Sequence, residues 1–431
     1  MWAVAPIAIR GGAGDPSNGG YVKATLMAAI LGLLAAGPAL AITRTVDSDG
    51  LATGANCSSA SPTPYTTIQA AIDAASSGDV VLVCPGTGPY DEQPVIDKPL
   101  TLRGLLDATI QPSPMTANSS NLTSLEPIAA GVLVEGTAGV TVESLTVDGS
   151  LNGLGDCGTN PVGIYFRNSS GSVKNVAVAD MRLSGGLLGC QVGLGIFVQS
   201  GGGGSSTVLV QGSSIHGYQK NGITANEDGS ALTARNNRVT GLGPVPDIAQ
   251  NGIQLGFGAA GTLEGNLIVN HVWTGCTPAS CSFVSANVLV FEAADGPVVR
   301  RNGMANAQVS IYYFGVDGGV IDGNDVTETR LFDGIYVAGD SNRVMSNNVT
   351  NSDGAGIFLE GNGNSLRKNR INEAPVGIWN WSGSNSIVTS GGNRNTFVNV
   401  GVPVHSGMSP PLTATLAAAS GGGRRQGSPV R

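Results

Sequence analysis

Two neighbouring stretches of the chain repeat one pattern: GIYVAGDSNRVMSNNV at residues 334–349 and GIFLEGNGNSLRKNRI at residues 356–371. Each stretch begins with Gly-Ile, alternates in polarity, passes a turn rich in Gly and Asn, and ends in Asn-x-Val or Asn-x-Ile. Further copies begin at Gly131, Gly163, Gly222, Gly252 and Gly377, with variant copies at Asn287 and Ile311. A period of about 22 residues with two or three short strands is typical of a solenoid.

The Asn that closes each copy recurs at six positions: Asn237, Asn266, Asn302, Asn324, Asn347 and Asn369. An Asn side chain tolerates the left-handed backbone of a sharp turn. It can also hydrogen-bond to its counterpart in the next coil, about 4.8 Å away, when the coils stack. We therefore interpret these residues as structural. Since a single coil cannot bury its inward face, stacking must supply the core, and the repeat predicts a parallel β-helix.

Composition supports an all-β fold. The 431 residues include 65 Gly, and only 12% are charged and 5% aromatic. Glycine disfavours helices, its irregular spacing excludes collagen, and the apolar share of 41%, placed in short β-branched runs, argues against disorder for most of the chain. A formal net charge of −8 argues against a general nucleic-acid binder.

The N-terminal residues indicate export. Lys23 precedes an apolar stretch, 24–36, which ends in Gly-Pro-Ala-Leu-Ala, as in a secretory signal cleaved after Ala41. This stretch is too short to span a bilayer, so we expect a secreted, periplasmic or cell-surface protein that does not span the membrane. The predicted parts are a signal peptide at 1–41, one β-helix domain at 42–410, and a disordered Gly/Ser/Arg tail at 411–431. Whether translation starts at Met1 or at an internal Met is left open.

Six cysteines in an exported chain favour disulfides. Neighbourhood in the sequence suggests three pairs: Cys57 with Cys84, Cys157 with Cys190, and Cys276 with Cys281. Zinc is the alternative, although the chain has no CxxC pair and only His271 stands near Cys276.

The segment 66–75 predicts a short capping helix with Thr66 as N-cap, Gln69 at the capping-box position and Gly78 beyond its end. Such a helix would cover the first coil, whose edge is otherwise unpaired.

The chain resembles the right-handed parallel β-helix proteins of the pectate lyase-like superfamily in the run TIQAAIDAASSGDVVLVCPGTGPYDEQPVIDKPLTLRG at 67–104. GYQKNGITANEDG at 217–229, GLGPVPDIAQNGIQLGFGA at 241–259 and the Asn-x-Val repeats are similar to exported bacterial β-helix repeat proteins, including the NosD-related type. The resemblance implies a right-handed parallel β-helix over residues 60–400. It leaves the function open, because the superfamily includes lyases, hydrolases, esterases and epimerases.

Outward positions follow from the Gly-Ile register. If each Ile points inward, the next residue points outward. The first outward column is Tyr165, Phe197, Thr224, Gln254, Leu289, Tyr312, Tyr336, Phe358 and Trp379; the second is Arg167, Gln199, Asn226, Gly256, Phe291, Phe314, Ala338, Glu360 and Trp381. These columns hold nine aromatic residues of a chain with 4 Trp, 8 Tyr and 9 Phe. We expect an exposed platform on which sugar rings stack; the alternative is rings that stack on one another or lie beneath a loop, the tail or a partner.

Another column, two residues before each Asn, alternates in charge along Arg235, Glu264, Arg300, Asp322, Met345 and Arg367. It predicts a ladder of salt bridges, with Arg301, Lys368 and Arg370 as additional positive charges nearby.

Candidate catalytic groups lie on the middle coils. Lys220 and Gln250 stand in equivalent places before the Asn-Gly of adjacent coils, with Asn221 stacked on Asn251. A polysaccharide lyase needs a base of lowered pKa and a group that stabilises an enolate. Lys220 is the predicted base and Gln250 or Asn251 the stabiliser; the alternative is that Lys220 is an exposed turn residue.

Hydrolysis needs a pair of carboxylates, for which Asp333 and Glu360 on adjacent coils are the candidates. The chain lacks the catalytic residue patterns that are typical of polygalacturonases, pectin methylesterases and epimerases. Calcium through Glu227, Asp228 or Asp247 is conceivable, but no EF-hand spacing supports it, and we assign no metal site. Copper, which the NosD resemblance implies, would need clusters of His, Met or Cys, and the three His are scattered.

The sequence therefore predicts an exported β-helix protein that binds polysaccharide, with lyase-type β-elimination favoured over hydrolysis as its chemistry. The alternative is a surface or adhesion protein with no enzymatic activity.

Overall fold

The computed structural model describes residues 41–49, 57, 64–105, 108–184, 189–276, 280–281, 283–411 and 426–427. The predicted signal peptide lies outside the described residues except for Ala41. Of the predicted tail, only Pro411 and the short strand at 426–427 are described. No helix among the described residues is long and apolar enough to cross a membrane.

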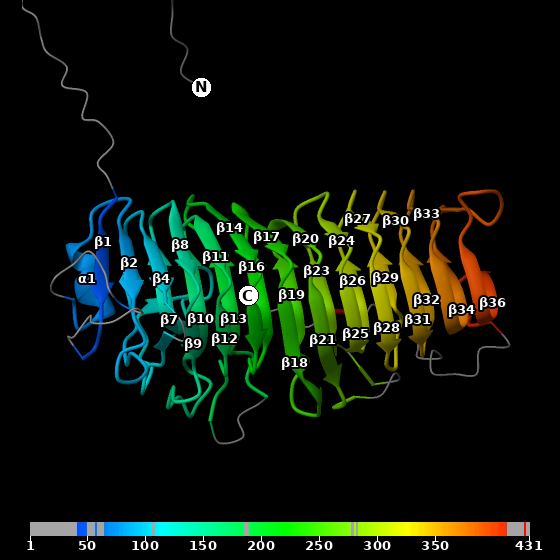
Figure 1. The fold of residues 1–431 in the computed structure, drawn as a ribbon. Coiled ribbons are helices and arrows are strands. Elements are labelled where there is room, and N and C mark those ends of the chain that lie inside the picture. Colours follow the sequence, from blue (N-terminus) through cyan, green and yellow to red (C-terminus); the bar gives the residue numbers. More distant parts are fainter. Residues whose placement is uncertain are drawn as a thin grey trace, which may run out of the picture. The chain divides into compact units, whose positions relative to one another are not determined.

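Parallel strands stack in three ladders that follow one another within each coil, and the coils succeed each other in chain order from α1 to β36 (Figure 1). The first ladder contains β3 (Val95–Ile96), β7 (Pro127–Glu135), β10 (Asn160–Arg167), β13 (Leu194–Gln199), β16 (Asn221–Asn226), β19 (Asn251–Gly256), β23 (Ala286–Phe291), β26 (Val309–Phe314), β29 (Ile335–Ala338), β32 (Ala355–Glu360) and the later halves of β34 (Arg370–Ser382) and β36 (Thr396–Ser406).

The second ladder contains β1 (Thr43–Val46), β2 (Val80–Val83), β4 (Thr101–Gly104), β8 (Val140–Glu143), β11 (Gly171–Lys174), β14 (Ser206–Gln211), β17 (Ser230–Arg235), β20 (Ala260–Glu264), β24 (Val298–Arg300), β27 (Val320–Asp322), β30 (Arg343–Met345), β33 (Ser365–Arg367) and β35 (Ser386–Ile387). The third contains β5 (Thr109–Ile110), β9 (Thr146–Asp148), β12 (Ala177–Ala179), β15 (Ser214–His216), β18 (Arg238–Val245), β21 (Leu267–Trp273), β25 (Gly303–Ala307), β28 (Asp325–Thr329), β31 (Asn348–Ser352) and the earlier halves of β34 and β36.

Two small pairings lie outside the ladders. Strand β6 (Ser119–Ser120) runs antiparallel to the start of β7. Strand β22 (Phe283–Val284) pairs in parallel with β37 (Gln426–Gly427), which brings the far end of the chain beside the middle coils.

The core fills the inside of the coils. The Ile of each Gly-Ile pair is fully buried, as at Ile223, Ile253 and Ile335, and belongs to one apolar cluster that continues from Val46 to Ile378. The preceding Gly is required by close packing: a Cβ on Gly222 would lie 2.8 Å from the carbonyl oxygen of Gly252 on the next coil. The predicted inward direction of the Ile column is confirmed.

The predicted Asn ladder is also confirmed. The backbone N–H of Asn324 donates to Oδ1 of Asn347 on the next coil at 3.0 Å, and its side-chain amide donates to the same oxygen and to the Val299 carbonyl, both at 2.9 Å. The same bonds extend the ladder to Asn395. Each Asn thus satisfies buried main-chain groups on both sides of a turn.

Helix α1 (Ile68–Ala74) lies against the first coil through buried Ile68, Ala71 and Ile72. Its N-cap is Thr67, whose side chain accepts from the Ala70 amide, so the predicted cap at Thr66 is wrong by one residue. The short-helix cap itself is confirmed.

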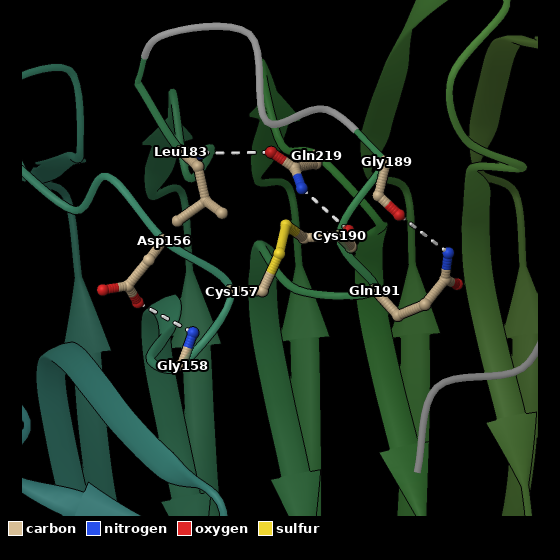
Figure 2. The surroundings of a disulfide bond; sticks show 8 residues. All are labelled: Asp156, Cys157, Gly158, Leu183, Gly189, Cys190, Gln191 and Gln219. Atoms are coloured by element: carbon tan, nitrogen blue, oxygen red, sulfur yellow. Dashed lines mark hydrogen bonds between the residues drawn. A yellow bond between two sulfur atoms is a disulfide. The ribbon is translucent and has the colours of Figure 1, made fainter.

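The three predicted disulfides, Cys57–Cys84, Cys157–Cys190 and Cys276–Cys281, are all present. Because every described Cys is bonded to another, none offers the thiolate that the zinc alternative requires. The second disulfide ties two loops beside Gln219, whose side chain accepts from the Leu183 amide and donates to the Cys190 carbonyl (Figure 2).

Candidate functional site

The outward column predicted from the Gly-Ile pattern matches the strand register of the first ladder. Tyr312 pairs with Tyr336, Tyr336 with Phe358, and Phe358 with Trp379. Earlier in the ladder, Tyr165 pairs with Phe197. The second column follows its predicted order up to Glu360.

The second column departs from prediction at its last step. A bulge between Leu359 and Glu360 places Glu360 opposite Ser382, where the sequence pattern predicts Trp381. Trp381 instead approaches its neighbours through ring contacts, with centroids 5.8 Å from Phe358 and 5.6 Å from Trp379.

The rings of the later coils form one continuous stack. Centroids are 4.7 Å apart between Tyr312 and Tyr336 and 4.9 Å apart between Tyr336 and Phe358, with planes 20° and 10° from parallel. We call this surface the aromatic face; it consists of Phe291, Tyr312, Phe314, Tyr336, Phe358, Trp379 and Trp381. Contacts of this kind stabilise neighbouring strands by about 0.5–1.5 kcal/mol per pair beyond burial, so the stack also holds the coils in register.

The prediction that these columns are exposed is wrong for most of their rings. The exposed fraction is 0% for Tyr165 and Phe197, 1% for Tyr312, 3% for Trp379 and 8% for Tyr336. Half-buried rings remain at Phe314, Phe358 and Trp381. Since each ring covers the face of the next, only these three offer a substantial surface to a ligand.

Tyr165 and Phe197 are covered by a loop around β6. The Tyr165 hydroxyl donates to Oε1 of Gln199 at 2.7 Å and lies 3.3 Å from the Ser120 carbonyl. Gln199 in turn accepts from the Leu122 amide at 2.9 Å and donates to Oδ1 of Asn121 at 3.0 Å. Burial raises the pKa of the Tyr165 hydroxyl. A sugar therefore cannot reach these two rings in this conformation, which corrects their predicted role in substrate binding.

The middle coils place amide side chains where the later coils place rings. The predicted stacking of Asn221 on Asn251 is confirmed by their register and by a hydrogen bond from Nδ2 of Asn251 to Oδ1 of Asn221 at 3.1 Å. Asn221 also donates to Oε1 of Gln254 at 2.8 Å, and Gln254 donates to Oδ1 of Asn226 at 2.9 Å. All four are fully buried, so this network holds the sheet together.

Lys220 is fully buried, so the alternative of an exposed turn residue is wrong. Its Nζ donates to the Ala249 carbonyl at 2.6 Å, and burial lowers its pKa to about 7. A lysine of lowered pKa is what proton abstraction requires. The same burial keeps the amine away from a polymer on the surface, and its catalytic role stays a prediction.

Gln250 is likewise fully buried and engaged with the main chain. Its Nε2 donates to the carbonyls of Tyr218 and Gln219 at 2.8 and 2.9 Å, and its Oε1 accepts from the Leu242 amide at 3.0 Å. These bonds fasten residues 246–250, the insertion between β18 and β19. The predicted role of Gln250 as an enolate stabiliser also stays a prediction.

Asp333 and Glu360 stand at opposite ends of the first ladder's strands. Asp333 accepts from the Ala355 amide at 2.7 Å, and Glu360 accepts from the Tyr336 hydroxyl at 3.1 Å. Glu360 pairs with Ala338, five residues beyond Asp333, which corresponds to about 16 Å along the strand. That exceeds the roughly 5–9.5 Å between the carboxylates of glycosidases, so these residues do not form such a pair here.

A buried hydrogen-bonded chain inside the coils was not predicted from the sequence. The Tyr218 hydroxyl lies 2.5 Å from Nε2 of His271, and Nδ1 of His271 lies 2.7 Å from Oδ1 of Asn287. Burial lowers the pKa of His271 to about 4. One signal was available: Asn287 replaces the Gly of the Gly-Ile pattern, so its side chain must find room near the neighbouring coil.

Potential metal ligands do not gather at the predicted acidic residues. Glu227 accepts a hydrogen bond from Thr123 at 2.9 Å. Across the described part of the chain, the one close group of potential ligand atoms is Asp47, Cys57 and Cys84. Both of its sulfurs belong to a disulfide.

Comparisons with known proteins place this geometry in a family. A model described as "Right handed beta helix region" matches residues 117–289 and 247–397, so the chain belongs to the right-handed β-helix family. The predicted right-handed parallel β-helix is thereby confirmed, while the closer NosD relationship stays a prediction. No curated protein sequence matches the chain.

Three solved structures share the fold. The A-module of mannuronan C-5 epimerase AlgE4 from Azotobacter vinelandii is 14% identical, with 80% of this chain and 95% of that chain covered and a TM-score of 0.51. The GH136 lacto-N-biosidase from Eubacterium ramulus is 12% identical, with 85% of this chain and 66% of that chain covered and a TM-score of 0.53. PfbA, a surface adhesin of Streptococcus pneumoniae, is 15% identical, with 79% of this chain and 86% of that chain covered and a TM-score of 0.52. At these identities the likeness concerns the fold alone.

Proposed function

We propose that this is an exported polysaccharide-binding protein whose aromatic face contacts the glycan. The observation that carries the proposal is the uninterrupted ring stack across neighbouring coils, with Phe314, Phe358 and Trp381 half-buried at its surface. Flat aromatic rings hold the apolar faces of sugars. A row of them along the coils would suit an extended polymer better than a single small sugar.

Polar groups at the edge of the aromatic face would complement such binding. Glu360 lies beside Phe358 in the chain and holds the Tyr336 hydroxyl, which fixes a carboxylate next to the rings. Sugar hydroxyls need acceptors of this kind around an apolar contact. Three disulfides fit the proposed export, since they persist in oxidising compartments.

The solved relatives are compatible with this proposal. One is named as an epimerase of mannuronan, one as a lacto-N-biosidase and one as a surface adhesin. These names cover both enzymatic and non-enzymatic proteins, so they support a glycan-related role without selecting a reaction.

Retention on a panel of insoluble polysaccharides tests the proposal. The double variant Phe358→Ala/Trp381→Ala should be retained about tenfold or more weakly than the wild-type protein, because each ring contributes roughly 1 kcal/mol of contact energy. Leu267→Ala is the matched control, since it removes an apolar side chain that is 42% exposed on the third ladder. Unchanged retention of the double variant would refute the aromatic face as the contact surface.

Lyase-type β-elimination with Lys220 as base is the enzymatic hypothesis, and it requires the buried amine to become accessible to the polymer. An adhesion protein without turnover is the alternative. Incubation with uronate polymers, with and without calcium, followed by absorbance of unsaturated products separates the two. If Lys220 is the base, Lys220→Ala abolishes product while glycan retention persists. Retention without product in the wild-type protein supports the adhesion role.

A further inference from the structure

Four exposed basic side chains gather where the second ladder turns into the third near the C-terminal end of the stack. Arg367 ends β33, Arg370 begins β34, and Lys368 lies in the turn between them. The Lys368 amide donates to the Asn393 carbonyl, which brings exposed Arg394 onto the adjacent coil. We call this surface the basic corner.

The equivalent turn three coils earlier is neutralised. There, Arg300 and Arg301 lie 3.0 and 3.1 Å from the two carboxylate oxygens of Glu264. These contacts also hold the pKa of Glu264 below its ordinary value, with the Arg300 hydrogen bond as the main cause. The predicted salt-bridge ladder is therefore real at this position.

The basic corner has no such compensation. None of its four residues forms an ion pair with an acidic residue of the described chain. The nearest acids in the same two columns are Asp322 and Asp325, each two coils back, which is about 10 Å. Positive charge is thus concentrated and accessible on a chain whose net charge is −8.

The turn that carries Lys368 has the same backbone conformation in each coil. Lys368 has φ of 57°, in the left-handed region, where a long side chain is disfavoured. The corresponding turn residues of earlier coils are Asn236, Gly265, Arg301, Gly323 and Ser346, with φ of 55°, 67°, 53°, 65° and 57°. A long basic residue therefore occupies this turn at two positions: Arg301 contacts Glu264, whereas Lys368 contacts no acid of the described chain.

We propose that the basic corner binds an acidic polysaccharide, one that carries carboxylate or sulfate groups on its sugars. Arg367, Lys368 and Arg370 share one coil and Arg394 lies on the next, about 4.8 Å away. The four cations thus form a compact cluster, and arginine forks match carboxylate and sulfate geometry. The corner joins the second and third ladders, so it is separate from the aromatic face on the first. The inference therefore does not rest on the proposed function.

An acidic glycan fits this surface better than a nucleic acid does. Three residues lie next to the basic corner: Met345 pairs with Arg367, Ser346 donates its amide to the Arg367 carbonyl, and Ser365 begins the strand that Arg367 ends. They offer hydroxyls and a thioether but no ring for base stacking. The overall negative charge also repels a densely charged duplex more than a polymer with about one charge per sugar.

Affinity electrophoresis in gels with alginate, polygalacturonate or neutral dextran tests the proposal at low and high salt. The triple variant Arg367→Gln/Lys368→Gln/Arg370→Gln should bind the acidic polymers about tenfold more weakly than the wild-type protein, with a weaker dependence on salt. Retardation by dextran should stay unchanged.

The matched control is Arg103→Gln/Arg182→Gln/Arg330→Gln, which changes net charge equally. These arginines are about as exposed, at 49%, 46% and 50% of the side chain, but each contacts an acid. Its affinity for alginate should stay within about twofold of the wild type. A second variant, Lys368→Gly, removes a corner charge at a position that suits glycine and should weaken alginate binding without lowering the unfolding temperature.

Three results would overturn the proposal: wild-type affinity in the corner variant, equal losses in both triple variants, or competition by duplex DNA as effective as that by alginate. The double variant Phe358→Ala/Trp381→Ala separates this inference from the proposed function. It should keep the salt-dependent binding of alginate even where it loses retention on neutral polysaccharide.

Discussion

Tyr336 and Phe358 occupy the same register position on adjacent coils, and their rings stack with centroids 4.9 Å apart. The Tyr336 hydroxyl extends past the stack to Glu360 at 3.1 Å. This one side chain therefore joins the apolar stack to a carboxylate at its edge, and its two parts can be tested separately.

Truncation of Tyr336 should be costly for stability. Tyr336→Ala removes a ring that is 8% exposed and should lower the free energy of unfolding by about 3 kcal/mol. Tyr336→Phe keeps the stack but removes the hydroxyl and its bond to Glu360, and it should cost about 1 kcal/mol. Chemical denaturation measures both, and equal losses would show that the hydrogen bond, not the stack, is the stabilising contact.

The Asn ladder should be sensitive to a single substitution. Asn324→Ala leaves the Val299 carbonyl and the amide of Asn302 without their side-chain partner. The expected loss is about 3 kcal/mol in the free energy of unfolding, since several buried groups become unsatisfied. Asn348→Ala, at a partly exposed position on the next coil, is the control and should cost less than about 1 kcal/mol.

Lys220 should make stability rise with pH in the alkaline range. Its pKa in the fold is about 7, below the ordinary value of 10.5, so the unfolded chain holds more protons between these limits. The free energy of unfolding should therefore increase there by up to about 1.4 kcal/mol per pH unit. Lys220→Met should remove this slope. Lys174→Met, at a partly exposed site, should retain it; an identical slope in the Lys220 variant would contradict the burial of the amine.

His271 should govern stability on the acidic side. Its pKa of about 4 lies below the ordinary value of 6.5 because burial disfavours the cation. As pH falls through this window the unfolded chain takes up a proton that the fold does not, and the free energy of unfolding should drop by about 3 kcal/mol. His271→Gln should flatten this dependence, whereas His216→Gln, at an exposed site, should leave it unchanged.

The sequence predicted register far better than exposure. The Gly-Ile pairs determine which residues point outward, because alternation in a strand follows from the inward Ile, and the Tyr312-to-Trp379 column follows it at every step. Coverage of Tyr165 by Ser120 depends on a loop that belongs to no repeat, and no pattern announces where such a loop folds back. The bulge before Glu360 likewise leaves no mark in a repeat of constant period.

At the candidate site, too, register was predictable and burial was not. The adjacency of Asn221 and Asn251 was predictable from equivalent places in two coils. The burial of Lys220 was not, because it depends on how the insertion that contains Ala249 closes over the amine. Pairing of all three disulfides was predictable because each joins sequence neighbours.

Hydroxyl-radical footprinting with and without bound polysaccharide tests the central claim most directly, because it reads side-chain protection residue by residue. We predict that the polymer protects Trp381, Phe358 and Phe314 and leaves Trp273, on the third ladder, as reactive as in the free protein. Protection of Trp273 with no change at Trp381 and Phe358 would contradict the aromatic face as the site of glycan contact.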